Sequence, residues 1–143
     1  MIIREVILQD ALQVCSLLEI LEYKLPEDIV RHKLAKLLAH PDEYCFVVEN
    51  DQQNIVALIS ISIIFQLALT GDFARISYFS VDEQYQSQGI GTLLERKCVE
   101  IAKMRGCNRI EVHCHSRRLR AHHFYEQHGF IESPKYFIKM LNS

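Results

Sequence analysis

The stretch SYFSVDEQYQSQGIGT, residues 77–92, decides the fold of this chain. It begins as the end of a strand, continues as a polar loop and opens a helix on two glycines, Gly89 and Gly91. The first-turn amides of a helix have no acceptor inside the helix, and the helix dipole makes that end partly positive. The stretch therefore predicts a turn that can hold a pyrophosphate on backbone amides. The alternative is a tight strand-to-helix turn that binds nothing.

The segments around this turn predict a mixed sheet covered by helices. Period-two alternation over 55–65 indicates a strand with one apolar face, opposite Ser60 and Ser62. Asp10 is expected to cap the first helix by accepting from its first-turn amides. Strands are expected over 2–8, 44–49, 55–65, 73–81, 109–114 and 132–140, and helices over 10–21, 26–38, 89–105 and 119–128. This order predicts an α/β fold of mixed type.

Length and composition narrow the class of protein. The 143 residues suit one domain, residues 1–143, and the formal net charge of −2 argues against general nucleic-acid binding. The apolar runs are shorter than the ~20 residues that span a bilayer, and the N-terminus lacks the layout of a signal peptide. Five cysteines stand singly, without a CxxC pair, which indicates free thiols in a reducing compartment. A cytoplasmic protein is expected.

Two motifs in this order resemble the GNAT N-acetyltransferase superfamily. The segment QSQGIG (86–91) fits the pattern Gln/Arg-x-x-Gly-x-Gly/Ala directly after the fourth expected strand, and AHHFYEQHGF (121–130) resembles the family's later helix. The resemblance covers roughly residues 57–140 and is to small, single-domain members of bacterial type. It implies a GNAT acyl-CoA N-acyltransferase fold, with a central, mostly antiparallel sheet of six to seven strands flanked by about four helices.

The resemblance implies acetyl-CoA as acetyl donor. The pantetheine arm would pair with the fourth strand around Phe79 and Val81, like an added strand. The family commonly opens that edge with a β-bulge, and the shift of apolar phase between Ile76/Tyr78 and Phe79/Val81 is compatible with one. A central strand covered on both faces gives the same pattern. The pyrophosphate would lie on the turn formed by Gln86, Ser87, Gln88, Gly89, Ile90, Gly91 and Thr92.

The resemblance also implies direct transfer from the thioester to an amine. Tyr125 matches the family's tyrosine that protonates the departing thiolate, although it could instead only pack against the donor. Where related sequences often carry a carboxylate on the fourth strand, this chain has Ser77 and Tyr78, so the general base stays open. The candidates are those expected on one face of the 109–114 strand and just beyond it: Glu111, His113 and His115. The alternative for Glu111 is an ion pair with an arginine such as Arg117.

The leading hypothesis is acetyl transfer from acetyl-CoA to a primary amine. A small acceptor amine that is not strongly cationic is favoured over a protein, because acidic side chains would suit a polyamine or aminoglycoside and the sequence shows no conspicuous acidic cluster. The alternatives are a non-catalytic acyl-CoA-binding regulatory module and a subunit of a larger acetylation complex. A homodimer is compatible with the resemblance. No metal is expected, because on a strand His113 and His115 point away from Cys114.

Overall fold

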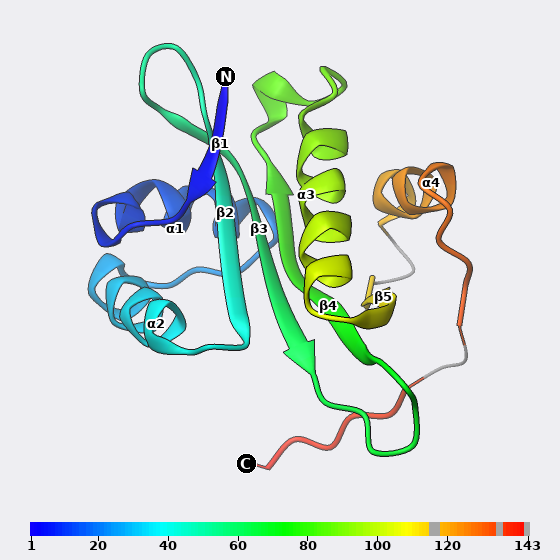
Figure 1. Cartoon of the computed structure of the whole chain (residues 1–143). Coiled ribbons are helices and arrows are strands. Elements are labelled where there is room, and N and C mark those ends of the chain that lie inside the picture. Colours follow the sequence, from blue (N-terminus) through cyan, green and yellow to red (C-terminus); the bar gives the residue numbers. More distant parts are fainter. Residues whose placement is uncertain (115–117, 134–135, 142–143) are drawn as a thin grey trace. The chain divides into compact units, whose positions relative to one another are not determined.

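The computed structural model describes residues 1–114, 118–133 and 136–141, and the chain divides into two compact units, Met1–Val112 and His113–Ser143. The first unit contains a five-stranded sheet in the order β1-β2-β3-β4-β5 (Figure 1). Neighbouring strands run antiparallel except β4 and β5, which run parallel. The strands are β1 (Ile2–Glu5), β2 (Glu43–Glu49), β3 (Ile55–Ile64), β4 (Asp72–Val81) and β5 (Cys107–Val112).

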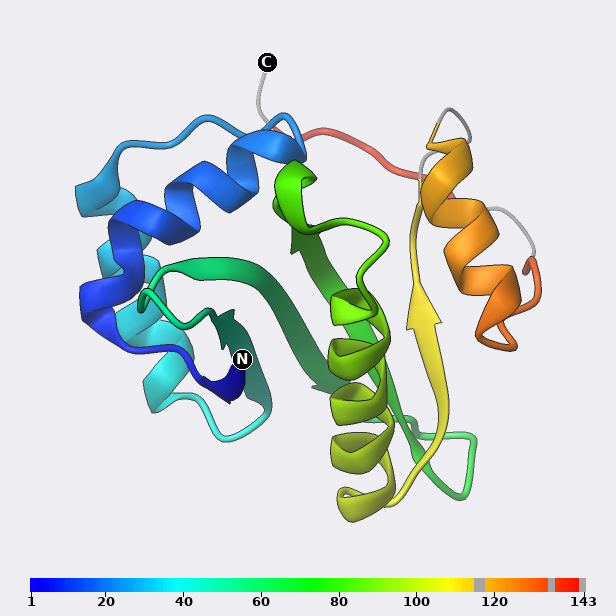
Figure 2. The same cartoon turned by 90° about the horizontal axis from the view of Figure 1, so that it is seen from above.

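The helices of the first unit lie on both faces of this sheet (Figure 2). α1 and α2 cover one face, where the Ser80 hydroxyl of β4 donates to the Leu17 carbonyl of α1 at 2.7 Å. α3 covers the other face, where the Lys97 ammonium lies 5.0 Å from the centre of the Phe46 ring of β2. The helical elements are η1 (Leu8–Asp10), α1 (Ala11–Ile20), α2 (Glu27–Ala39), η2 (Glu83–Tyr85) and α3 (Ile90–Met104).

β3 is buried on both faces, which corrects the expectation of a single apolar face. Val56 and Leu58 are as buried as their neighbours, and Ser60 is only 7% exposed. The reason is that helices cover the sheet on both sides, so the strand needs no solvent face. Phe65, expected to continue the apolar face, lies beyond the end of β3 and is exposed.

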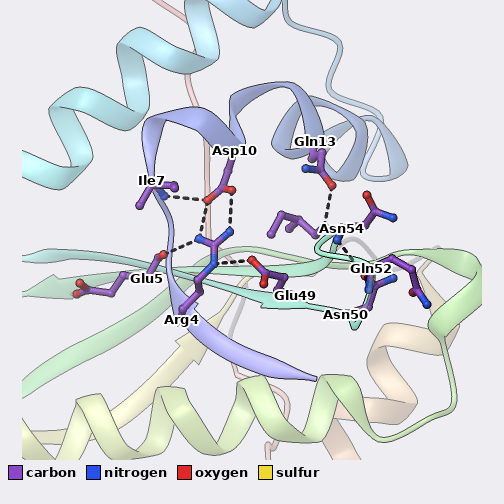
Figure 3. A network of polar contacts seen from close by, with 10 residues as sticks. Arg4, Glu5, Ile7, Asp10, Gln13, Glu49, Asn50, Gln52 and Asn54 are labelled. Carbon is purple, nitrogen blue, oxygen red and sulfur yellow. Dashed lines mark hydrogen bonds and ion pairs between the residues drawn. The ribbon is translucent and has the colours of Figure 1, made fainter.

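Asp10 does not cap α1 in the expected way. Its carboxylate accepts from the Ile7 amide at 2.8 Å and from two Arg4 nitrogens at 2.9 Å, and α1 has no side-chain cap there (Figure 3). The turn η1 stands between strand and helix, so the carboxylate points back to Ile7. Burial raises the pKa of Asp10, but the hydrogen bonds from Arg4 and Ile7 outweigh it and hold the pKa below its usual value. The ion pair therefore connects β1 to the start of α1.

β4 contains a β-bulge, with which the shift in its apolar pattern was compatible. Ile61 pairs with Ile76 and Ser60 pairs with Tyr78, so Ser77 is an extra residue on β4. Because of that extra residue, Ile76 and Phe79 both face α3 although they are three positions apart. The shift of apolar phase along this strand thus has a structural cause in the bulge, although β4 also lies centrally in the sheet, between β3 and β5.

The second unit contains α4 (Leu119–Gln127), which ends before Gly129 in the left-handed region at φ 86°. The strand expected over 132–140 is not formed by the residues described there, 132–133 and 136–141. Apolar alternation favours a strand, but a strand also needs a neighbour for its backbone groups, and Phe137 is 97% exposed. The described part of the chain thus has five strands, one or two fewer than expected.

Candidate functional site

A loop between β4 and α3 is held by its own side chains. The Asp82 carboxylate accepts from the Gln84 amide at 2.9 Å, and the Gln86 side-chain amide donates to the Val81 carbonyl at 3.0 Å. The Tyr85 hydroxyl accepts from the Asn50 side chain at 2.9 Å, which connects the loop to the turn between β2 and β3. These contacts fix the position from which α3 begins.

Gly89 stands at the N-cap of α3 in the left-handed region, with φ 83° and ψ 3°. An added Cβ would meet nothing within 4 Å, so glycine is required by the backbone conformation and not by lack of space. Ser87, two residues earlier, also has a positive φ of 66°. Because Gly89 is the N-cap, the N-cap residue itself supplies no side-chain oxygen to the positive end of the α3 dipole. The expected pyrophosphate-binding residues are contiguous in this turn.

The ladder between β4 and β5 ends at the bulge. Their ladder runs from Asp72 opposite Cys107 to Ile76 opposite Val112, whereas β4 continues to Val81. Phe79 and Val81, the residues expected to pair with the pantetheine arm, lie on this last part of β4. β5 ends at Val112, short of the expected end at residue 114, so the bulge residue Ser77 is the first residue of β4 beyond this ladder.

Polar and aromatic side chains gather on the α1/α2 face at the bulge. The Ser77 and Ser62 hydroxyls lie 3.2 Å apart, and the Ser62 hydroxyl donates to Glu43 Oε1 at 2.8 Å. The Tyr78 ring meets the Tyr23 ring edge-on, with centroids 5.6 Å apart. Sequence reasoning missed the contact among Ser77, Ser62 and Glu43. The only sign of it was the position of Ser62 opposite the apolar residues of its strand.

Glu111 is engaged in ion pairs on the same face of the sheet. Its carboxylate lies 2.9 Å from Arg75 Nη2 and 3.9 Å from Arg109 Nη1. The Arg109 guanidinium also lies over the Phe73 ring, 4.5 Å from its centre. The predicted alternative, an ion pair with an arginine, is thus what the structure shows. The partners are Arg75 and Arg109, whereas Arg117 lies outside the described residues.

The other catalytic candidates belong to the second unit. His113 stacks on Tyr136, with centroids 4.4 Å apart and an interplanar angle of 11°. Tyr125 lies on α4, where its ring meets that of Phe130 edge-on at 5.3 Å and its carbonyl accepts from the Phe130 amide at 3.0 Å. His115 lies outside the described residues. Tyr125 and His113 therefore stay candidates within their own unit, and Glu111 in the first.

The described residues offer neither a cysteine poised for acyl transfer nor a metal cluster. All five cysteines are free thiols, and burial raises the pKa of Cys45 and Cys98 to about 12. Both thiols are therefore protonated at neutral pH and poor nucleophiles. Among residues 1–114, 118–133 and 136–141, no group of three or more His, Cys, Asp or Glu side chains could hold a metal ion. No helix in the same ranges is long and apolar enough to cross a membrane.

The sequence of this chain matches the model of one protein family. Residues 9–130 match the sequence model described as the acetyltransferase (GNAT) family. No curated protein sequence matches the chain.

Solved structures match over nearly the whole chain. A GNAT family acetyltransferase from Staphylococcus aureus superposes with a TM-score of 0.83 at 20% identity, covering 98% of both chains. The aminoglycoside antibiotic 6'-N-acetyltransferase AAC(6')-Ig from Acinetobacter haemolyticus gives a TM-score of 0.83 at 20% identity and covers 99% of this chain and 100% of its own. Glucosamine-6-phosphate N-acetyltransferase from Arabidopsis thaliana gives a TM-score of 0.83 at 18% identity and covers 99% of this chain and 98% of its own. Because the sequence identities are only 18–20%, these superpositions show that the chain shares the fold of these proteins.

Proposed function

Because the chain belongs to the GNAT acetyltransferase family, we propose that it transfers an acetyl group directly from acetyl-CoA to a primary amine of a small molecule or peptide. One observation carries the proposal. The left-handed Gly89 turn opens α3 after β4, a strand with a bulge beyond which its ladder with β5 has ended. The backbone amides from Gln86 to Thr92 would hold the pyrophosphate, since a helix N-terminus favours anions. The end of β4, with Phe79 and Val81, would pair with the pantetheine arm.

The chain's own residues would serve three needs of the reaction. A backbone amide of β4 beyond the bulge would donate to the developing oxyanion. Tyr125 would protonate the departing thiolate, because a phenol is protonated at neutral pH. A base must also take a proton from the acceptor, since amines of this kind are mostly protonated at neutral pH.

The proposed acceptor is a small amine. The names of two similar structures specify N-acetyl transfer involving an aminoglycoside and glucosamine-6-phosphate, so this fold can serve small acceptors. The charged groups on the sheet face near the bulge are of both signs, as in the ion pairs of Glu111 with Arg75 and Arg109. Such a face does not require a strongly cationic acceptor. We further propose a cytoplasmic protein of one domain, active alone or as a homodimer.

One observation favours a second candidate function. Ser77 and Tyr78 occupy the bulge, where a carboxylate would be the simplest base. A module that binds acyl-CoA without turning it over would need no base there. A subunit of a larger acetylation complex could obtain the missing group from its partner.

Calorimetry with acetyl-CoA and with CoA tests the shared part of these proposals. We expect both to bind in the micromolar range, followed by thiol release when a panel of primary amines is added. Binding without thiol release across the panel would favour the non-catalytic module. If neither nucleotide binds to a folded sample, the assignment of the glycine turn is wrong.

A further inference from the structure

The bulge of β4 is the start of a hydrogen-bonded chain across three strands. Ser77 on β4, Ser62 on β3 and Glu43 on β2 are joined by contacts of 3.2 Å and 2.8 Å. Ser77 is exposed, whereas Ser62 and Glu43 are half-buried. This series of hydrogen bonds therefore runs from the surface at the bulge to the half-buried carboxylate of Glu43.

The donor and acceptor in each of these hydrogen bonds follow from counting protons. An ionised carboxylate only accepts, so the single hydroxyl proton of Ser62 goes to Glu43 Oε1. Ser62 then has only lone pairs left for Ser77, and the proton between the two serines must come from Ser77. The Ser77 oxygen consequently keeps an accepting lone pair for a donor that approaches the bulge.

We propose that Ser77, Ser62 and Glu43 form a relay that removes a proton from the acceptor ammonium. The ammonium gives its proton to Ser77 Oγ while the Ser77 proton moves to Ser62 Oγ and the Ser62 proton moves to Glu43 Oε1. The nitrogen keeps the electron pair of the broken N–H bond and becomes nucleophilic. Both serines are again hydroxyls, and Glu43 becomes a neutral acid. This relay rests on the proposed function, because it supplies the base that acetyl transfer to an amine needs.

Glu43 suits this task better than Glu111. Glu111 lies on the same sheet face, but its carboxylate is already paired with Arg75 and Arg109. Within the described residues Glu43 has no ion-pair partner, and Ser62 is the side chain that donates to it. Arg75, the register partner of Ser62 on β4, pairs with Glu111, and Glu43 is the carboxylate that the two serine hydroxyls join to the bulge.

The aromatic pair beside Ser77 offers a surface for the rest of the acceptor. Tyr78 follows Ser77 in the bulge, and its ring lies edge-on against Tyr23. These side chains are 41% and 50% exposed, so both present ring surface next to the relay. An acceptor whose carbon skeleton rests there would bring its amine to the Ser77 oxygen.

The relay is tested with hydroxyl-deleting and hydroxyl-keeping variants of the same residue. We expect Ser62→Ala to lower kcat/KM at pH 7 by ~10²-fold, the lower end for general-base catalysis, with unchanged affinity for acetyl-CoA. Ser62→Thr keeps the hydroxyl, suits a strand and should retain most of the activity. Ser77→Ala, at an exposed position, and Glu43→Gln should repeat the loss. Glu100→Gln, a surface change on α3, serves as the control.

The pH profile separates a relay from a merely structural role. With an alkyl amine of pKa ~10 as acceptor, the deficit of Ser62→Ala should shrink as the pH approaches 10, because a neutral amine needs no base. A deficit that is constant with pH, or full activity of Ser62→Ala at pH 7, would overturn the relay while leaving acetyl transfer by the wild type intact. A wild type that binds acetyl-CoA but acetylates no amine would overturn the proposed function and the relay together.

Discussion

Replacement of Gly89 by alanine should weaken acetyl-CoA binding without unfolding the protein. Gly89 has φ 83°, and a Cβ there meets nothing within 4 Å, so the cost is conformational and not steric. An L-residue in the left-handed region costs about 1–2 kcal/mol. For a chain of 143 residues this corresponds to a fall in Tm of about 3–6 °C. If the strain shifts one amide off the pyrophosphate, the lost charge-assisted hydrogen bond of about 1.5–3 kcal/mol weakens binding at least about tenfold.

Gly106 provides a matched control at the other end of α3. It has φ 71°, and its added Cβ also meets nothing within 4 Å, so Gly106→Ala should lower the Tm by a similar amount. Its affinity for acetyl-CoA should equal that of the wild type. Calorimetric titration and thermal unfolding of both variants check this. Equal affinities of Gly89→Ala and Gly106→Ala, with both proteins folded, would refute the assignment of the Gly89 turn to the pyrophosphate.

Two further predictions concern the ion pair at β1 and the tyrosine of α4. Asp10→Asn should destabilise the fold by about 1–3 kcal/mol at pH 7, because Arg4 loses its charged acceptor. The folded pKa of Asp10 lies below its unfolded value, so its contribution is complete above the unfolded pKa and is lost as the pH falls through the folded pKa. The free energy of unfolding, measured by urea titration, should therefore become equal for wild type and Asp10→Asn in acid. A difference in unfolding free energy that does not change with pH would contradict this account. Tyr125→Phe should lower turnover by at least ~10²-fold with little change in acetyl-CoA affinity, measured by thiol release and calorimetry, whereas an unchanged rate would leave Tyr125 a packing role.

Local patterns in the sequence predicted the order of elements up to α4 and the glycine turn, and the phase of β4 was compatible with the bulge. These features depend on residues close together in the sequence. Examples are the shift in the alternation of apolar residues after Ile76 and the glycine that precedes a helix. The relay residues could not be predicted, because Glu43 meets Ser62 only through the register of β2 on β3, and Ser62 meets Ser77 only through the bulge. The partners of Glu111 depend in the same way on the parallel register of β4 and β5. Apolar alternation near the C-terminus favoured a strand that does not form, because alternation says nothing of a neighbouring strand.

The extra residue in β4 also limits how this part of the chain can change in length during evolution. Deleting Ser77 would exchange the faces of one half of the strand, because side chains alternate with a period of two. Either the half-buried Phe79 would turn away from α3, or Ile76 would leave the core. The loop between β3 and β4 has no alternation of side chains between two faces to preserve, and its Leu67 is 92% exposed. Insertions and deletions among homologues should therefore accumulate in that loop, while the length from Asp72 to Val81 stays constant.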